Sequence, residues 1–312
     1  MPSPAAGFCH EALLYGGDAD FVDGTARFVQ AGLDHDEPTL VAVSSQRIAL
    51  LRDRLGSEAD QVEFVDMVEL GHNPARIIPA WREFLDVHGR HRGAVRGVGE
   101  PIWSGRSAAE LVECQRHEAL LNVAFDGSYA FSLMCPYDVS ELPETVIAEA
   151  LRTHPLVLHD GVDTFSEASA PHEMADAFLD IPLPEPMVPF REMEFGFGEL
   201  HSLRSLVTAV ARRTAMGYDR CYDLVLALSE IATNSVIHGG GNGIFRIWVD
   251  ERSVVCEIRD QGQLNDPLVG REQPPVDGFG QRGLWMVNQL CDLVQIRVFP
   301  SGTVVRLHMA IA

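Results

Sequence analysis

The 312-residue sequence contains no lysine, and all 24 of its lysine-plus-arginine positions are arginine. Without an ε-amino group the chain can supply neither a phosphate-loop lysine, nor a Schiff base, nor a lysine general base. The six cysteines are scattered without any CxxC spacing, which argues against zinc binding and against a disulfide framework. These absences exclude several common kinds of enzyme site.

Long hydrophobic runs are also missing. No stretch of about 18 consecutive apolar residues occurs, and residues 1–14 lack the basic region and the apolar core of a signal peptide. We therefore expect a cytoplasmic protein with no membrane partner. The net charge of −21 disfavours nucleic acid and anionic membranes as partners.

The charge divides the chain into two parts. Residues 1–190 hold 31 acidic residues against 12 arginines, whereas residues 191–312 hold 14 against 12. The segment IPLPEPMVPF at 181–190 has four prolines and can sustain neither a helix nor a central strand. The sequence predicts a first domain over 1–170, a proline-rich linker over 171–190 and a second domain over 191–312. We also expect a last helix of the first domain around HEMADAF, at 172–178.

In the first part, apolar β-type runs alternate with helical patterns, which predicts an α/β domain with a mostly parallel sheet covered by helices. Its first turn, Gly17 to Thr25, reads GDADFVDGT and ends in Gly-Thr where a phosphate loop would have Gly-Lys-Thr. Because that lysine is missing and Asp18, Asp20 and Asp23 would repel phosphate, we expect no phosphate binding here.

The second part has a different order of elements. A strand is followed by two helices, two strands, a long loop, one helix and two final strands. Strands and helices are therefore segregated, which predicts an α+β sandwich with helices on one face of an antiparallel sheet.

One helix of this second part carries a polar stripe. In EIATNSVIHGGG (230–241), Glu230, Asn234 and His238 are spaced i, i+4, i+8 and share one helix face, while apolar residues centre on the opposite face. The glycine run then ends the helix. A solvated helix face would also fit this pattern when it is taken alone.

Two further segments follow in order. A strand over 253–260 ends in Asp260 and is followed by Gln-Gly, and the later loop GFGQRG places Gly278, Gly280 and Gly283 before a helix. Such a loop can bring backbone N–H groups and a helix N-terminus close to phosphate. The ordered set is a stronger signal than a glycine-rich loop alone.

Residues 191–312 resemble the GHKL ATPase superfamily, which includes gyrase and the histidine kinases. EIATNSVIHG resembles its N box, DQG its first glycine box and GFGQRG its second. The resemblance implies that ATP and Mg²⁺ bind here: Asn234 as the Mg²⁺ ligand, Asp260 as the acceptor for the adenine amino group, and Gly262 as room for the base. It also implies that Glu230 orients or deprotonates the attacking hydroxyl. The glycines of the second box, Gly278, Gly280 and Gly283, would form a lid over the phosphates.

Two arginines lie in the lid region, Arg271 and Arg282. We choose Arg282 as the residue that would stabilise the transferring charge, because it lies among the lid glycines. His238 is expected to cap the glycine turn or to pack, and is not assigned a catalytic role.

The branch of the superfamily follows from what precedes the domain. A histidine kinase would carry a phosphoacceptor motif His-Glu-x-x-x-Pro, whereas the His-Glu pairs at His10, His117 and His172 lack that proline and are interpreted as structural. The compact domain resembles the anti-sigma-factor serine kinases instead. This implies a sigma factor and a small STAS-type anti-anti-sigma antagonist as partners.

The first domain resembles the MEDS sensory domain through HEALLYG, GEPIW at 99–103, CQRHEALLN and LMCPYD at 133–138. The resemblance implies a RecA-like fold with an eroded phosphate loop, and the sensing of an unknown small molecule. Trp103, Cys135 and Tyr137 either line a pocket for that molecule or belong to the core.

Together these features predict an anti-sigma regulator whose ATP-dependent serine/threonine kinase domain is modulated by a sensory domain. Two alternatives stay open. One is an ATP-gated binding module that sequesters a partner without phosphoryl transfer, and the other is an orphan histidine-kinase-like sensor. A homodimer is compatible with each of them.

Overall fold

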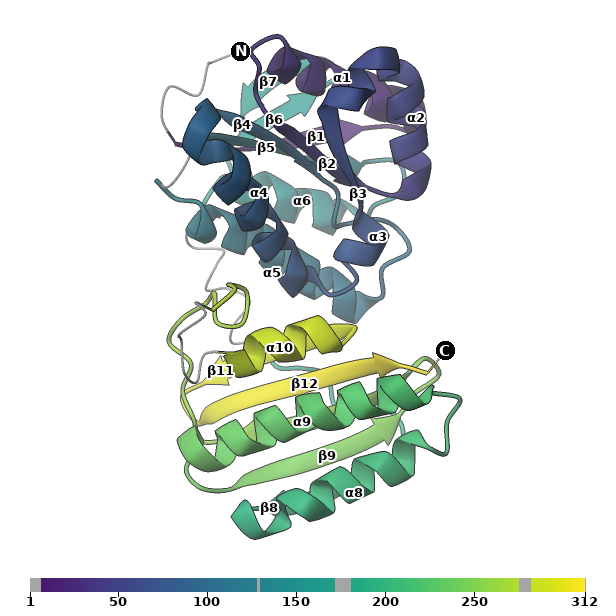
Figure 1. The fold of residues 1–312 in the computed structure, drawn as a ribbon, viewed down its shortest axis with the longest axis vertical. Coiled ribbons are helices and arrows are strands. Elements are labelled where there is room, and N and C mark those ends of the chain that lie inside the picture. The colour runs from purple at the N-terminus through teal and green to yellow at the C-terminus, as the bar shows by residue number, and fades with distance from the viewer. Residues whose placement is uncertain (1–6, 128–129, 172–180, 275–281, 312) are drawn as a thin grey trace. The chain divides into compact units, whose positions relative to one another are not determined.

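The computed structural model describes residues 7–127, 130–171, 181–274 and 282–311 (Figure 1). The chain divides into two compact units, Met1–Ala175 and Asp176–Ala312, and each has a sheet of its own. The predicted two-domain architecture is confirmed. The helix expected around HEMADAF lies outside the described residues.

The first unit is built on a seven-stranded sheet within the described part of the chain, in the order β3-β2-β4-β5-β1-β6-β7. Its strands are β1 (Phe8–Tyr15), β2 (Thr39–Val43), β3 (Val62–Asp66), β4 (Val95–Gly99), β5 (Phe131–Asp138), β6 (Leu156–His159) and β7 (Val162–Phe165). All neighbours pair in parallel except β6 and β7, which form an antiparallel edge. The mostly parallel sheet is therefore confirmed, whereas the relation to RecA stays a prediction.

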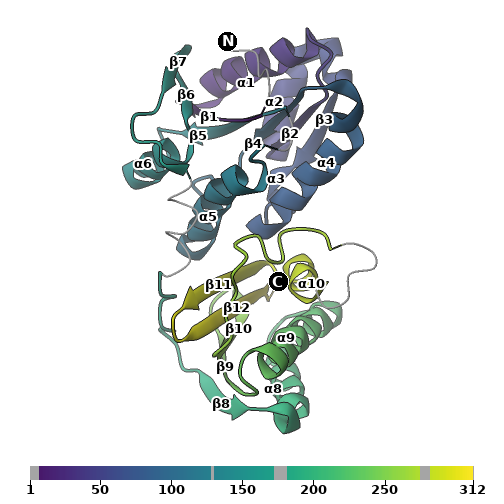
Figure 2. The same cartoon turned by 90° about the vertical axis from the view of Figure 1, so that its left-hand side faces the viewer.

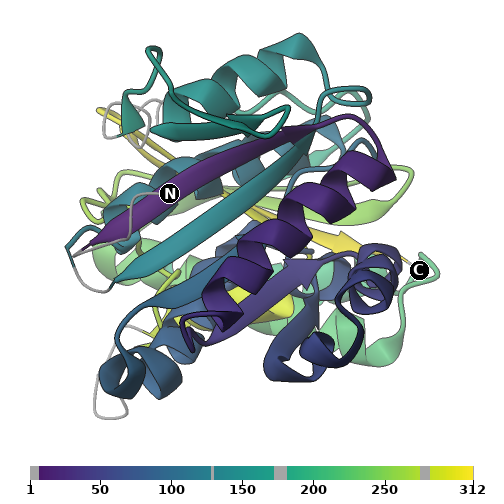
Figure 3. The ribbon, with the colours of Figure 1, turned by 90° about the horizontal axis from the view of Figure 1, so that it is seen from above.

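Helices cover both faces of this sheet (Figures 1 and 2). They are α1 (Asp18–Leu33), α2 (Ser45–Leu55), α3 (Met67–Leu70), α4 (Ile77–Arg92), α5 (Ala108–Ala124) and α6 (Glu144–Thr153), with 3-10 turns at Gly56–Gln61 and Pro74–Arg76. Phe21 and Phe28 of α1 share one core with Leu13 and Val41 of the sheet. In Figure 3, α1 lies across the strands on this face. Every helix in the described ranges is too short or too polar to span a bilayer.

The other face is closed by Trp81 of α4, which is 1% exposed. Glycines on β4 make room for its indole ring: a Cβ added at Gly97 would lie 2.8 Å from Trp81 Cζ3, and one added at Gly99 would lie 3.0 Å from Cζ2. The missing side chains of β4 therefore determine how closely α4 packs on the sheet.

Only two residues separate β1 from α1, which leaves no room for a phosphate-cradling loop. Charged side chains fill the adjoining carboxyl edge of the sheet. Arg47 of α2 pairs with the buried Glu100, and the Tyr15 hydroxyl donates to Glu100 Oε1 at 2.8 Å. Arg47 also lies 3.8 Å from Asp138 at the end of β5.

The second unit has a five-stranded antiparallel sheet within the described part of the chain, in the order β11-β12-β10-β9-β8. Its elements are β8 (Arg191–Phe195), a 3-10 turn (Phe197–Glu199), α8 (Leu200–Ala211), α9 (Tyr218–His238), β9 (Gly243–Val249), β10 (Ser253–Asp260), α10 (Arg282–Leu290), β11 (Leu293–Phe299) and β12 (Gly302–Ala310). The three helices lie on one face of the sheet (Figures 1 and 2). The expected helix-on-sheet arrangement is confirmed.

Strand alternation separates the two faces of this sheet. On β10, Val254, Cys256 and Ile258 enter the core shared with the helices. Glu257 points to the opposite face, is 0% exposed, and accepts hydrogen bonds from Arg259 Nε at 2.7 Å and from Arg306 Nε at 2.8 Å. The outer face therefore carries a buried ion-pair network.

The proline-rich segment 181–190 attaches to this network. Arg306 donates to the carbonyl of Pro184 at 2.9 Å, and Arg297 donates to the carbonyl of Ile181 at 3.0 Å. Glu185 accepts from both Arg246 and Arg259. Residues predicted as a linker thus contact the outer face of the second sheet.

Replacing Trp81 by alanine should lower the free energy of unfolding of the first unit by about 3–5 kcal/mol, because a fully buried indole is lost. Gly97→Ala should cost about 1–3 kcal/mol through overpacking. In the double variant the two losses should be less than additive, since the clash disappears with the indole. Urea unfolding followed by circular dichroism measures all three.

Gly16→Ala is the control for this series, because its added Cβ would make an ordinary 3.6 Å contact with Asp20. Strictly additive losses for Trp81 and Gly97 would contradict the packing described here.

Candidate functional site

The polar stripe of α9 lies beside the core of the second unit. Leu224, Leu228 and Ile231 are buried between the helix and the sheet, while Glu230 and Asn234 are half-buried. The helix ends at His238, and the Gly239 N–H donates to the Ser235 carbonyl at 2.8 Å. The helix and its glycine stop, both expected from the sequence, are confirmed.

Asp260, the last residue of β10, is held at the end of α9 by two hydrogen bonds. Its Oδ1 accepts from the Gly262 N–H at 2.8 Å, and its Oδ2 accepts from the Ser235 hydroxyl. The Gln261 N–H donates to the Gly239 carbonyl at 3.1 Å. A carboxylate has about four lone-pair positions, so each oxygen can still accept a bond from a ligand.

Glycines allow this close approach. A Cβ at Gly239 would lie 2.5 Å from Asp260 Cγ, and a Cβ at Gly262 would lie 3.2 Å from the Gly239 Cα. Any larger side chain at position 239 would push the helix end away from the strand. Gly262, the glycine of the first glycine box, lies against Gly239 in turn, so both glycines support the position of Asp260.

The start of α10 meets the other end of the stripe. A Cβ at Gly283 would lie 3.1 Å from Glu230 Oε2 and 3.3 Å from Asn234 Nδ2. The structure thus brings Gly283 to Glu230 and Asn234, although it follows them by 53 and 49 residues in sequence. Arg282 begins α10 and is exposed, and Arg271 is buried with 4% exposure.

The remaining two lid glycines, Gly278 and Gly280, lie outside the described residues. Their predicted place over phosphates therefore stays a prediction.

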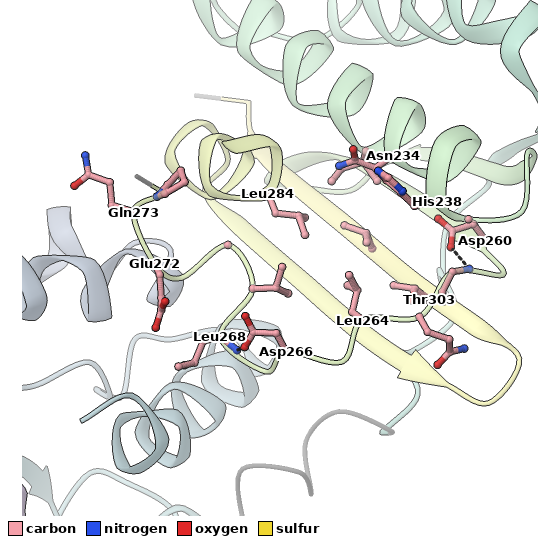
Figure 4. Close-up of a pocket in the computed structure, with 18 residues that line it drawn as sticks. Asn234, His238, Asp260, Leu264, Asp266, Leu268, Glu272, Gln273, Leu284 and Thr303 are labelled. Carbon is pink, nitrogen blue, oxygen red and sulfur yellow. Dashed lines mark hydrogen bonds between the residues drawn. The ribbon is translucent and has the colours of Figure 1, made fainter. Parts of the chain in front are cut away.

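A cavity of about 560 Å³ opens between α9, the end of β10 and the loop that follows it. Figure 4 shows Asn234 and His238 projecting from α9, with Asp260 beside them and Leu264 and Leu268 on the loop. Its wall is completed by these further residues: Ile231, Gly239, Gly262, Gln263, Asp266, Val269, Gly270, Glu272, Gln273, Pro274, Leu284, Thr303 and Val305.

The lining of this cavity combines polar and apolar groups. Asp260 offers an acceptor carboxylate among apolar neighbours such as Ile231, Leu264 and Val305, which suits a planar base that carries an amino group. Beside Gly283, the Glu230 carboxylate and the Asn234 side-chain amide each carry oxygen, the ligand type that Mg²⁺ prefers. The volume falls within the roughly 300–1,000 Å³ typical of small-molecule sites. The residues present therefore fit a nucleotide with Mg²⁺.

Sequence reasoning missed two residues that support the site. Ser235 bonds Asp260, and Thr303 donates from its hydroxyl to the Gly262 carbonyl at 2.7 Å. Ser235 follows Asn234 directly and is 1% exposed, so its position on the sheet side of α9 was a usable signal. Thr303 pairs with Asp260 across β10 and β12, a relation that only the register reveals.

Family comparisons agree with both halves of the fold. Residues 9–155 match the model of the MEDS domain, the methanogen/methylotroph DcmR sensory domain. Residues 197–309 match the model of the histidine kinase-like ATPase domain. The second unit is thus a domain of the histidine kinase-like ATPase class.

Among individual proteins, the chain is similar to the serine-protein kinase RsbW of Halalkalibacterium halodurans. The two are 32% identical over 119 residues, which are 34% of this chain and 72% of that protein. The chain therefore belongs to the GHKL superfamily in its anti-sigma-factor serine kinase branch, with a MEDS domain on the N-terminal side.

The chain is also similar to a solved structure, that of the RsbU and RsbW domains of Rv1364c from Mycobacterium tuberculosis. It aligns with 39% of this chain and 32% of its own chain, at 18% identity and a TM-score of 0.30. This chain therefore spans about a third of the length of that protein.

Ser235→Ala should lower the free energy of unfolding of the second unit by about 1–2 kcal/mol, because Asp260 loses a charge-assisted hydrogen bond. Ser229→Ala is the matched control on the same helix. Its hydroxyl bonds only the Val225 carbonyl at 2.7 Å, so the change should stay within about 0.5 kcal/mol. Chemical unfolding of both variants measures the difference, and equal effects would contradict the role given to Ser235.

Proposed function

We propose that the second unit binds ATP with Mg²⁺ and transfers a phosphoryl group to a serine or threonine of a small antagonist protein. The observation that supports this most directly is the convergence around one cavity. Asp260, fixed by Ser235 and Gly262, and Asn234 both line this cavity, and Gly283 lies against Asn234 and Glu230.

In this proposal Asp260 accepts the hydrogen bond of the adenine amino group, and Gly262 leaves space for the base. The apolar residues Leu264 and Leu268 cover the ring. Such a ring buried among apolar side chains gains affinity from area removed from water, while the carboxylate selects for the amino group.

Asn234 would hold Mg²⁺ through its amide oxygen, and Gly278, Gly280 and Gly283 would surround the phosphates. Bound ATP supplies the phosphoryl group, and Mg²⁺ offsets its negative charge. Glu230 takes the proton of the attacking hydroxyl, and Arg282 stabilises the charge on the transferring group. The Glu230 carboxylate is half-buried near Gly283, where a general base should lie.

The partners in this proposal are a sigma factor and a STAS-type anti-anti-sigma protein. The relative in Halalkalibacterium halodurans bears the name serine-protein kinase, which supports a serine as phosphate acceptor. Phosphorylation of the antagonist would keep it from competing for this chain, and the sigma factor would then stay bound.

The first unit would modulate this activity as a sensor with a RecA-like fold. Segment 181–190 is a suitable route, because Glu185 is bonded to Arg259, the residue next to Asp260. A movement of this segment would therefore act on β10, the strand that ends in Asp260.

Calorimetric titration of ATP with Mg²⁺ into the full chain tests the pocket. Asn234→Ala and Asp260→Asn should each weaken binding by about 10- to 100-fold, because each removes a bond to a charged or polar ligand group. Asp250→Asn is the matched control. That carboxylate also accepts two backbone N–H bonds, from Arg252 and Ser253, but it lies in the β9–β10 turn. Failure of the wild-type protein to bind ATP would refute the proposal.

Glu230→Gln should keep ATP affinity nearly unchanged and slow phosphoryl transfer by about 10²- to 10⁴-fold, since only the general base is lost. Transfer is measured as label from γ-labelled ATP on STAS-type proteins, with the exposed Glu251→Gln as control. Acid-stable label supports serine or threonine transfer. Acid-labile label would indicate a histidine kinase, and tight ATP binding without label would indicate a sequestering module.

A further inference from the structure

Four metal-ligating side chains meet in the interior of the first unit. His10 comes from β1, Glu118 from α5, Cys135 from β5 and His154 from the residue after α6. All are nearly inaccessible, with exposed fractions of 2%, 1%, 1% and 0%. One donor atom from each lies within 4.8 Å of all the others.

The hydrogen bonds around His10 determine its tautomer. The Asn122 amide nitrogen donates to the carbonyls of Glu118 at 3.3 Å and Thr153 at 3.0 Å. The Asn122 Oδ1, which can only accept, faces His10 Nδ1 at 3.2 Å. His10 Nδ1 therefore carries the proton, and in the neutral ring Nε2 presents a lone pair.

His154 is oriented in the same way. Its Nδ1 lies 2.8 Å from the Ala150 carbonyl, which can only accept, so Nδ1 is again the donor. Both Nε2 atoms then face Glu118 Oε2, each at 3.3 Å, and His10 Nε2 lies 3.4 Å from Cys135 Sγ. Two imidazole lone pairs and a carboxylate therefore point at one another.

Most of these inward-facing atoms are hydrogen-bond acceptors. Neither Glu118 oxygen nor His154 Nε2 has a hydrogen-bond partner among the described residues. Buried acceptors without a donor are costly.

We propose that these four residues bind a divalent first-row transition-metal ion of the zinc type. The Cys135 thiolate and the Glu118 carboxylate would balance its two positive charges, and the two imidazoles would complete four donors. Three of the six donor separations are 3.3–3.4 Å, which agrees with the roughly 3.3–3.7 Å edges of a tetrahedral site with bonds of about 2.0–2.3 Å, and all six are within 4.8 Å. On binding, Cys135 gives up its proton to solvent.

The donor set selects the class of ion. Thiolate and imidazole favour zinc and its neighbours over Mg²⁺ and Ca²⁺, which prefer oxygen donors. Asn122 and the Ala150 carbonyl fix both rings from behind, as outer partners of metal-bound histidines do. With four protein donors and no exposure, the site is of the closed, structural kind.

Occupancy of this site would connect four elements that meet around the middle of the first sheet. The ion would join β1, α5, β5 and the end of α6, so its loss would loosen the core of the sensory unit. This inference does not depend on the ATP site in the second unit.

The test uses the full chain after chelator treatment, titrated with Co²⁺ and then with Zn²⁺. We expect one equivalent of Co²⁺ to bind with the visible bands of tetrahedral cobalt and the near-ultraviolet band of a cobalt–thiolate bond, and Zn²⁺ to displace it. Cys135→Ser should abolish the near-ultraviolet band. Absence of stoichiometric Co²⁺ and Zn²⁺ binding by the wild-type chain would overturn the proposal.

Cys114→Ser is the matched control, because Cys114 is equally buried and donates only to the Pro101 carbonyl at 3.3 Å. Cys114→Ser should keep the cobalt–thiolate band. If the band were lost in Cys114→Ser and kept in Cys135→Ser, the assignment of Cys135 would be refuted. Asn122→Ala is the alternative test variant if Cys135→Ser does not fold. It should weaken Zn²⁺ binding by about 10- to 100-fold, and unchanged affinity would count against the site.

Discussion

The close contact between the end of α9 and the end of β10 is the constraint on which the candidate site depends. Gly239 and Gly262 let the helix end approach Asp260 at van der Waals distance, and Ser235 and the Gln261 N–H lock that approach with hydrogen bonds. A helix rises 1.5 Å per residue, so Glu230 stands about 13 Å along the axis from Gly239. Glu230 and the helix end that contacts Asp260 are therefore kept at a separation that α9 itself sets.

The lack of lysine has a structural counterpart on the outer face of the second sheet. The guanidinium group of Arg246 contacts Glu185, Glu192 and Glu257 at once. The ammonium group of a lysine is compact and has no planar fork of donors, so it would not make the same set of contacts. Glu257 is fully buried, and its carboxylate also pairs with Arg259 and Arg306. Buried networks of this kind add little net stability, because desolvation offsets the attraction.

Local patterns in the sequence predicted what depends on local geometry. The helical period of α9 and the strand ending at Asp260 were both foreseen, because helix and strand periodicity are visible in single segments. The short strands β6 and β7 were not assigned, since four-residue strands with mixed polarity leave no clear period. The cluster around Glu118 was missed for another reason. His10 and His117 were interpreted as structural, and the cysteine spacing argued against zinc. The four donors come from distant segments, and only the order of the strands brings them together. Ser235 and Thr303 likewise act across elements.

The position of β1 between β5 and β6 has a consequence for synthesis. Phe8 pairs with Phe131, so the first strand has no partner until the ribosome has added more than a hundred residues. At about 5–20 residues per second this takes roughly 6–25 s. Throughout that time an apolar strand with unpaired backbone groups is exposed. The second unit, whose β9–β10 and β11–β12 hairpins are local, has no comparable delay, so the nascent first unit is where chaperones would be most needed.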